Sequence, residues 1–277
     1  MRELRGAPAA AALLENVARD IAELSTRGIV PCLGVVRIGQ NPSDISYEKG
    51  IIKRFEGMKA SVRLTQLDEN CTQDEAEQAI RSLNDDKTVH GILLFLPVPK
   101  HLNAFALRSL IDPKKDVDGA NPLSAGLLAT GRDCFAPCTA AAVTELISYY
   151  DIPLSGRDVC VVGRSAVVGR PLATLLINLN ATVTVCHTKT TDLAAHTRAA
   201  DIIVACAGSP AMLKENMVNE TSYVIDVGTS LFEGKIVGDV SPSAREKAAA
   251  CSPVPGGVGA LTTSVLLKHT VESAKRG

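Results

Sequence analysis

The sequence predicts an α/β protein of two domains, in which parallel strands alternate with helices. Short apolar runs alternate with amphipathic segments along most of the chain. At residues 160–171 an apolar run enters a glycine-bounded turn and then an apolar helix, an arrangement typical of dinucleotide-binding sheets. A length of 277 residues, 46% of them hydrophobic, is sufficient for two medium-sized domains.

The first half of the chain predicts alternating helices and strands. Leu13, Val17, Ile21 and Leu24 recur at helical spacing, and Gly28 is expected to end that helix. Further strands are predicted at 33–38, 61–67 and 91–96, with helices from about 43 to 56 and, behind a capping box of Thr72 and Glu75, as far as Leu83.

The pattern becomes irregular between residue 97 and the loop at 116–122. Thr139 is then expected to cap a helix that contains Val143, Leu146, Ile147 and Tyr150 and connects the two domains. The second domain is predicted to have strands at 158–163, 182–186, 201–205 and 223–227, followed by a loop at 253–259 and a final helix at 261–274.

Charge and composition exclude several classes of partner. The net charge is −1 and no basic stripe is present, so neither nucleic acid nor an anionic membrane is an expected partner. No apolar run approaches the ~20 residues of a membrane helix, and we expect a cytoplasmic protein. The eight cysteines are spread singly and the five histidines do not cluster, which indicates free thiols and no metal site.

The turn at 163–169 is the first candidate site. Gly163 lets the backbone approach a phosphate, and Gly169 lets the following helix pack closely with its N-terminal amides toward the anion. The spacing is not G-x-G-x-x-G, so a purely structural turn remains the alternative.

The residues after the second strand of this domain favour NADP over NAD. The segment from Cys186 to Thr190 has no acid that would bind a ribose 2′-hydroxyl. Thr188, Lys189 and Arg164 can instead donate to a 2′-phosphate. A solvated surface lysine is the alternative interpretation of Lys189.

Three places in the first half carry residues that packing alone does not require: Tyr47, the run 96–99 and the run 115–119. The second follows a predicted strand, where parallel sheets bind ligands. Tyr47 as a half-buried aromatic and Asp118 as a turn residue are the alternatives, and Asp116 is expected to be structural.

Five motifs together carry a family resemblance: Asp-Val-Asp-Gly at 116–119, Pro-Cys-Thr at 137–139, Gly-Arg-Ser at 163–165, Val-Gly-Arg-Pro at 168–171, and Pro-Val-Pro-Gly-Gly-Val-Gly at 253–259. From about residue 7 to its end the chain resembles the methylenetetrahydrofolate dehydrogenase/cyclohydrolase family. The resemblance implies a folate-binding catalytic α/β domain over 1–137, completed by a C-terminal helix at 261–277. It also implies a Rossmann-like NADP-binding domain with a parallel sheet over 138–260, with a cleft between the two domains.

The family's reaction moves a hydride from the methylene carbon of 5,10-methylenetetrahydrofolate to a nicotinamide. In most members water then opens the methenyl product to 10-formyltetrahydrofolate. Members form homodimers through the cofactor domain. The resemblance therefore implies tetrahydrofolate derivatives as substrates, NADP as cofactor and a homodimer.

The resemblance also assigns individual residues. Tyr47 and Asp118 are the expected catalytic residues: Tyr47 would border the pterin and p-aminobenzoyl groups, and Asp118 would accept from the pterin amino and ring N–H groups. The expected substrate-binding residues are Tyr47, Leu96, Pro97, Val98, Asp118, Pro255, Gly256 and Gly257. The expected cofactor-binding residues are Thr139, Gly163, Arg164, Ser165, Val168, Gly169, Pro171, His187, Thr188, Lys189, Ala207, Gly208 and Gly228.

Two positions depart from the family pattern: Ile51 stands at the position of the family's catalytic Lys, and Phe95 at that of its partner Gln. On a regular helix Lys49 and Lys53 point about 160° and 120° away from Tyr47. Arg54 shares the Tyr47 face, but its guanidinium stays protonated and cannot act as a base.

Hydride transfer requires proximity and orientation without a protein base, whereas water attack requires proton management. We therefore expect dehydrogenase activity to survive and cyclohydrolase activity to be weak or absent. Two alternatives remain open: a full bifunctional enzyme in which a shifted helix brings Lys49 or Lys53 inward, and a non-catalytic folate- or nucleotide-binding protein.

Overall fold

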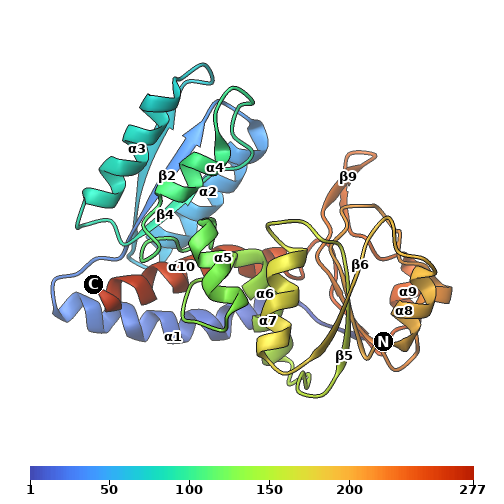
Figure 1. Cartoon of the computed structure of the whole chain (residues 1–277). Coiled ribbons are helices and arrows are strands. Elements are labelled where there is room, and N and C mark those ends of the chain that lie inside the picture. The colour runs from blue at the N-terminus through green and yellow to red at the C-terminus, as the bar shows by residue number, and fades with distance from the viewer. The chain divides into compact units, whose positions relative to one another are not determined.

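The computed structural model describes residues 1–277 and divides into two compact units (Figure 1). The three-stranded unit comprises Ala12–Cys138 and Thr263–Gly277, and the six-stranded unit comprises Met1–Ala11 and Thr139–Thr262. Two long helices, α1 (Gly6–Thr26) and α10 (Gly259–Arg276), each contribute residues to both units.

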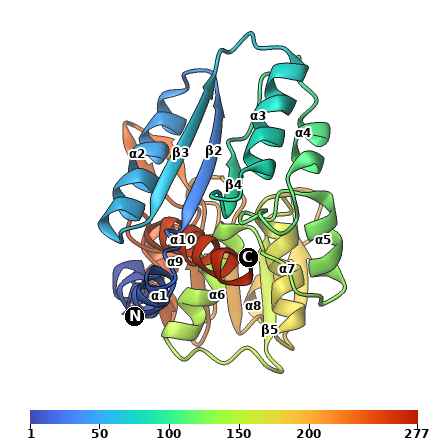
Figure 2. The same cartoon turned by 90° about the vertical axis from the view of Figure 1, so that its left-hand side faces the viewer.

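The three-stranded unit contains a parallel sheet in the order β3-β2-β4, formed by β3 (Ser61–Leu67), β2 (Cys32–Ile38) and β4 (Gly91–Leu94). Every residue of the central strand β2 is buried. Figure 2 shows α2 (Pro42–Gly57) on one face and α3 (Gln73–Asp85) with α4 (Ala104–Leu110) on the other. One cluster of buried side chains, which includes Val36, Ile80, Ile92 and Leu107, fills the layer between the sheet and these last two helices.

Side-chain caps fix the ends of these helices. Asn41 accepts from the Ser43 amide at the start of α2. The predicted capping box of Thr72 and Glu75 is present at the start of α3 and satisfies two amides that have no partner inside the helix.

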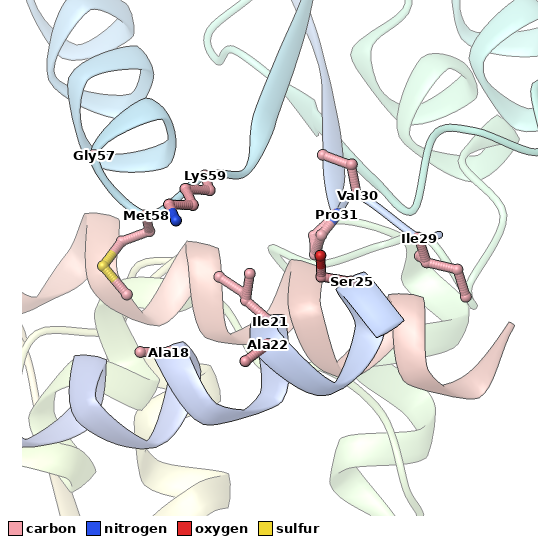
Figure 3. A pocket seen from close by; sticks show the side chains of 10 residues that line it. All are labelled: Ala18, Ile21, Ala22, Ser25, Ile29, Val30, Pro31, Gly57, Met58 and Lys59. Carbon is pink, nitrogen blue, oxygen red and sulfur yellow. The ribbon is translucent and has the colours of Figure 1, made fainter. Parts of the chain in front are cut away.

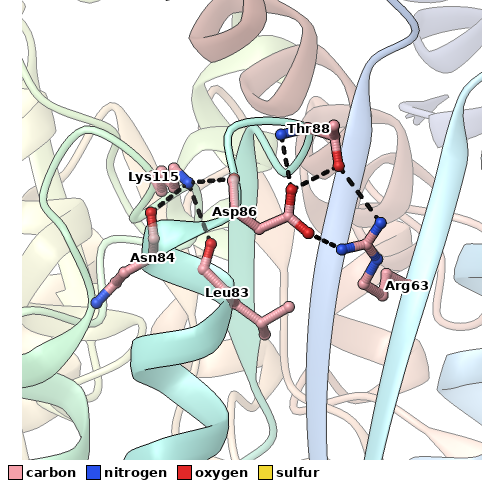
Figure 4. Close-up of polar contacts among 6 residues, drawn as sticks. All are labelled: Arg63, Leu83, Asn84, Asp86, Thr88 and Lys115. Atoms are coloured by element: carbon pink, nitrogen blue, oxygen red, sulfur yellow. Dashed lines mark hydrogen bonds and ion pairs between the residues drawn. The ribbon is translucent and has the colours of Figure 1, made fainter.

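Lys115 closes the other end of α3 (Figure 4). Its ammonium group donates to the carbonyl oxygens of Leu83, Asn84 and Asp86 at 3.1, 2.7 and 2.8 Å. The carboxylate of Asp86 in turn pairs with Arg63 and accepts from Thr88. A cation at a helix C-terminus satisfies exposed carbonyls. This anchor fixes the start of the segment 115–119.

The six-stranded unit contains a parallel sheet in the order β1-β11-β8-β7-β5-β6. Its strands are β1 (Arg2–Glu3), β5 (Asp158–Val162), β6 (Thr182–Cys186), β7 (Ile202–Ala205), β8 (Tyr223–Asp226) and β11 (Ala250–Cys251). Figure 1 shows α6 (Cys138–Tyr149) and α7 (Gly169–Asn178) beside one face, and α8 (Leu193–Ala199) and α9 (Pro242–Lys247) beside the other. A cluster that includes Cys160, Ile203, Val224 and Ala244 forms its core.

The N-terminal residues differ from the expected domain division. We predicted residues 1–137 as one domain, but Met1–Ala11 belong to the six-stranded unit because β1 pairs with β11, with Arg2 opposite Ala250. A two-residue strand has no periodicity that a sequence pattern can show.

Several elements were not predicted. α4, α5 (Pro122–Ala129) and the hairpin of β9 (Ser230–Phe232) and β10 (Lys235–Val237) are too short for a clear periodic pattern, although Asn103 and Asn121 do cap the two helices. The prediction that Thr139 caps the connecting helix was wrong. α6 already begins at Cys138, whose amide donates to Asp118.

No helix is long and apolar enough to cross a bilayer. All eight cysteines are free, and six of them are buried.

Candidate active site

The first group of predicted residues lies in the three-stranded unit around Tyr47 and Phe95. Their rings pack with centroids 5.8 Å apart and planes inclined by 35°. Phe95 directly follows β4 and is buried, whereas Tyr47 on α2 remains 36% exposed. Burial, with smaller contributions from Cys138 and Asp118, raises the pKa of the Tyr47 hydroxyl far above its usual range. The hydroxyl therefore stays protonated and can exchange hydrogen bonds without acting as a base.

Asp118 follows the Lys115 anchor and points its carboxylate at the start of α6. One carboxylate oxygen accepts from the Cys138 amide at 2.9 Å. The turn depends on Gly119, which has a φ of 58° and whose hypothetical Cβ would lie 2.8 Å from the Phe135 carbonyl. Burial raises the pKa of Asp118, and the bond from Cys138 partly offsets this.

The neighbouring acid, Asp116, has a structural role as expected. Its fully buried carboxylate accepts from the amides of Ala120 and Asn121 and from the Ser124 hydroxyl at 2.6 to 2.9 Å. These bonds use its acceptor capacity to fold the loop before α5.

Ile51 lies in the core of the unit. α2 is a regular α-helix from Pro42 to Gly57, and the Ile51 side chain is 0% exposed. Lys49 and Lys53 are both exposed on other faces of the helix. A helix of this regularity brings neither ammonium group to the Tyr47 face.

A buried ion pair supports α2 and was not predicted. The Arg37 guanidinium of β2 donates to the Glu48 carboxylate at 2.7 Å, and both side chains are at most 7% exposed. Arg37 also donates to the carbonyl of Gly39. The sequence signal was an arginine inside an otherwise apolar strand, which requires a buried partner.

The run after β4 contains further predicted substrate residues. The Leu96–Pro97 peptide is cis. Leu96 and Val98 pack against the apolar core cluster, while Pro97 is exposed.

A pocket of about 440 Å³ in the same unit lies elsewhere (Figure 3). It is lined by residues of α1 and of the segments before β2 and β3: Ala18, Ile21, Ala22, Ser25, Ile29, Val30, Pro31, Gly57, Met58 and Lys59. These segments lie at the amino ends of the strands, whereas parallel sheets place their reactive sites at the carboxyl ends. No predicted site residue lines this pocket.

In the six-stranded unit, the turn after β5 requires its glycines. Gly163 has a φ of 137°, and a Cβ there would lie 2.4 Å from the Cys206 carbonyl oxygen. A Cβ on Gly169 would lie 2.2 Å from the Gly163 carbonyl. The Ser165 hydroxyl closes the turn by accepting from the amides of Val168 and Gly169 at 3.1 and 3.3 Å. Arg164 projects into solvent beside it.

The loop after β7 is held by an acid that sequence reasoning missed. The fully buried Asp239 carboxylate accepts from the amides of Ala207, Gly208 and Ser209 at 2.6, 3.0 and 2.7 Å. Gly228 is required beside it, because a Cβ there would lie 2.1 Å from that carboxylate. The signal in the sequence was an acid within a run of apolar and small residues, 236–240.

Asp226, at the end of β8, holds Asp239 in turn. Its carboxylate accepts from the amides of Asp239 and Val240 at 2.9 and 3.1 Å. Burial raises the pKa of Asp226 to about 6. Two successive carboxylates thus fix the loop at 206–209 to the sheet.

The remaining predicted cofactor residues follow β6. The Thr190 hydroxyl accepts from the His187 amide at 2.8 Å, and the His187 ring accepts from the Lys189 amide at 3.1 Å. This turn leaves Thr188 and Lys189 exposed. Because the strands are parallel, the turns after β5, β6, β7 and β8 all lie at one edge of the sheet.

The remaining predicted site residues lie in the loop after β11, near the start of α6 and in α7. The Val254–Pro255 peptide is cis, and the Gly256 carbonyl accepts from the Gly6 amide at 2.8 Å. Gly257 is buried, while Pro255 and Gly256 are exposed. Thr139, near the start of α6, and Pro171, in α7, are half-buried and buried respectively.

A glycine-dependent turn before a helix, at the carboxyl edge of a parallel sheet, defines the six-stranded unit as a dinucleotide-binding unit of an α/β enzyme. The edge fits such a ligand: Gly163 and Gly169 let the turn pack tightly against neighbouring backbone, Arg164 and Lys189 are exposed, and no acid stands between Cys186 and Thr190.

Comparisons with known proteins agree with a dinucleotide-binding α/β enzyme. The family model for the catalytic domain of tetrahydrofolate dehydrogenase/cyclohydrolase matches residues 4–118, and the model for the NAD(P)-binding domain of the same family matches residues 137–277. The chain belongs to the tetrahydrofolate dehydrogenase/cyclohydrolase family. The predicted family and the predicted α/β fold with a parallel nucleotide-binding sheet are confirmed.

Three relatives illustrate the similarity. The bifunctional protein FolD of Bacillus pumilus is 44% identical over 95% of this chain and 93% of its own. The bifunctional enzyme FolD of Campylobacter jejuni, a methylenetetrahydrofolate dehydrogenase/cyclohydrolase of known structure, is 42% identical with a TM-score of 0.97, covering 100% and 99% of the two chains. FolD of Trypanosoma brucei, solved with NADP and an inhibitor, is 36% identical with a TM-score of 0.92, and the match covers 98% of this chain and 96% of that one.

Proposed function

We propose that this chain oxidises 5,10-methylenetetrahydrofolate to 5,10-methenyltetrahydrofolate with NADP as hydride acceptor. The observation that carries this proposal is the glycine-dependent carboxyl edge of the six-stranded sheet. Gly163, Ser165, Val168 and Gly169 would form the turn that holds the pyrophosphate. The FolD structure from Trypanosoma brucei, solved with NADP, supports the same cofactor here.

Selectivity for NADP is proposed to come from the turns after β5 and β6. Arg164, Thr188 and Lys189 are exposed donors that would hold a 2′-phosphate. The loop at 206–209 with Gly228 would face the remainder of the cofactor, and Asp239 keeps that loop in place.

Folate is proposed to bind in the three-stranded unit. Asp118 would accept from the amino and ring N–H groups of the pterin, and Tyr47 would border the ring system with its exposed face. The same proposal gives substrate contacts to Leu96, Pro97 and Val98. Pro255, Gly256 and Gly257 keep the substrate role that the family resemblance implies.

We further propose that hydrolysis of the methenyl product is weak. The support is the burial of Ile51 on the Tyr47 face of a regular helix, with Phe95 packed against Tyr47. General acid–base catalysis typically contributes ~10²–10⁴-fold, and no ammonium group of α2 is placed to provide it.

The full bifunctional enzyme is the second candidate, and the names of the relatives favour it over weak hydrolysis. Those relatives are called bifunctional FolD and are 40% to 44% identical to this chain. This candidate requires Lys49 or Lys53 to turn inward, or another group to handle the proton.

We also propose a homodimer through the six-stranded unit. β6 is an edge strand of the sheet, and its residue Val185 is exposed. Three further apolar side chains nearby in the chain are also exposed: Val167 in the turn before α7, Ile177 in the last turn of α7, and Leu179 just after it. An exposed apolar edge is typical of a strand that pairs or is covered. Sedimentation of the wild type and of Val185→Asp tests this: the proposal predicts a dimer and a monomer respectively, and a monomeric wild type would contradict it.

The dehydrogenase proposal is tested by measuring the reduced nicotinamide formed after 5,10-methylenetetrahydrofolate is added with NADP or NAD. We expect reduction with NADP, a much lower kcat/KM with NAD, and at least tenfold lower kcat/KM for methylenetetrahydrofolate in Asp118→Asn. Asp112→Asn, which alters a half-buried acid of the same unit outside the site, should keep wild-type kinetics. Binding of both ligands without turnover would instead indicate the non-catalytic protein.

A further inference from the structure

The carbonyl oxygen that precedes Asp118 is held by two side chains from other parts of the three-stranded unit. Val117 O lies 2.9 Å from His269 Nδ1 of α10 and accepts from Cys138 Sγ at 3.3 Å. Val117 itself is completely buried, and Gly91 of β4 makes room for it: a Cβ on Gly91 would lie 2.8 Å from its methyl groups. The peptide that joins Val117 to Asp118 is therefore fixed in the core.

The hydrogen bond from His269 determines the state of its ring. A carbonyl oxygen only accepts, so Nδ1 must carry the hydrogen. The ring is buried and packs on Phe135 with centroids 5.0 Å apart. Burial lowers the pKa of His269 to about 4, so the imidazole is neutral near pH 7.

Cys138 connects the same carbonyl to the carboxylate of Asp118. Its amide donates to Asp118 at 2.9 Å while its thiol donates to Val117 O. Cys138 Sγ also lies 3.8 Å from His269 Nδ1. A displacement of the Val117 carbonyl would therefore move both the Asp118 carboxylate and the amide that orients it.

We propose that His269 is a positioning residue for folate binding, which fixes the Asp118 carboxylate by donating from Nδ1 to the carbonyl of Val117. The proposal rests on the folate role of Asp118 given above. His269 does not touch Asp118 and acts through the peptide of Val117 and through Cys138.

The alternative is that His269 only fills space. The two roles predict different variants to be tolerated. His269→Leu fills much of the volume but leaves the Val117 carbonyl without its nitrogen donor, and a buried acceptor that loses its partner tends to move toward another. His269→Asn is smaller but keeps an N–H donor close to the position of Nδ1.

The test compares steady-state kinetics of the two variants. If His269 positions Asp118, His269→Leu raises KM for methylenetetrahydrofolate at least tenfold with kcat changed less than threefold and KM for NADP unchanged. His269→Asn stays within threefold of the wild type. Cys138→Ala, which removes the thiol donor but keeps the amide, should raise the same KM by a smaller factor.

Thr270→Val is the matched control. Its hydroxyl is fully buried and donates to the Leu266 carbonyl within α10 rather than to the Val117 carbonyl. This variant should keep wild-type KM values. Melting temperatures of all variants separate loss of stability from loss of positioning.

A wild-type KM in His269→Leu, or equal KM values in His269→Leu and His269→Asn, would overturn the inference. Absence of turnover in the wild type would instead contradict the proposed function. In that case the same variants are compared by calorimetric titration with tetrahydrofolate, and a tenfold weaker affinity in His269→Leu alone is the result expected.

Discussion

Ile51 lies one helical turn after Tyr47 on α2, and the two side chains differ in environment. Ile51 is 0% exposed and belongs to the core, while Tyr47 is 36% exposed. Residues four apart share a helix face, so the position that could act together with Tyr47 is occupied by an aliphatic group. Phe95, packed against Tyr47, makes the neighbouring surface apolar as well.

Replacing both apolar residues tests the proposal that hydrolysis is weak. We expect Ile51→Lys combined with Phe95→Gln to raise the rate of methenyltetrahydrofolate hydrolysis at least tenfold above the wild type. Placing an ammonium group in the core should also lower the free energy of unfolding by roughly 3–5 kcal/mol. Loss of absorbance of the methenyl compound and urea unfolding measure the two effects. Ile51→Met, which keeps the volume without a charge, should leave hydrolysis unchanged.

Adding a methyl group at Gly163 should weaken NADP binding. The new Cβ would meet the Cys206 carbonyl and the φ of 137° would be strained, at a cost of roughly 1–3 kcal/mol. We expect KM for NADP to rise at least tenfold in Gly163→Ala. Gly156→Ala is the control, since Gly156 also has a positive φ but nothing lies within 4 Å of its added Cβ. Equal KM values for NADP in Gly163→Ala and Gly156→Ala would contradict the proposed role of the Gly163 turn.

Asp239 should be needed to hold the loop at 206–209. An asparagine offers one oxygen and an amino group to the three amides that the carboxylate now satisfies, so Asp239→Asn leaves buried donors unpaired. We expect KM for NADP to rise about tenfold, equivalent to roughly 1.4 kcal/mol, with KM for folate unchanged. Asp201→Asn, which alters an acid that accepts one amide bond at the other end of the sheet, should not change either KM.

The sequence predicted the long periodic elements and the glycine turns well because their signals are local. The capping box of Thr72 and Glu75 and the strand before Gly163 depend on residues close together in the chain. The contacts that hold the site are not local. Asp239 reaches Ala207 and His269 reaches Val117 across 32 and 152 positions, and no spacing rule connects such pairs.

Short elements were missed for a related reason. β1 has two residues and is defined only by its pairing with β11. The roles of Arg37 and Glu48 could have been suspected from an arginine within the buried strand β2, but only the coordinates identify Glu48 as its partner.

The stability of the protein should carry an acid-sensitive contribution from His269. Its pKa is about 4 in the folded state and near 6.5 in the unfolded chain, so the unfolded state binds more protons between these values. The contribution is complete above about pH 6.5 and is lost as the pH falls toward 4, on the order of 3 kcal/mol. Urea unfolding at several pH values should show this loss of unfolding free energy in the wild type and a smaller loss in His269→Asn.

The raised pKa of Asp226 changes the unfolding free energy in the opposite direction in both proteins, so its effect cancels in the difference between them. Parallel curves for the two proteins would show that His269 is not buried in its neutral form.

The most direct test of the role of Ile51 is the hydrolysis rate of 5,10-methenyltetrahydrofolate by the wild-type enzyme, measured on the same preparation that reduces NADP with methylenetetrahydrofolate. The account predicts rapid NADPH formation and hydrolysis close to the rate without enzyme. Hydrolysis comparable in rate to NADPH formation would contradict it and would identify the chain as a full bifunctional enzyme.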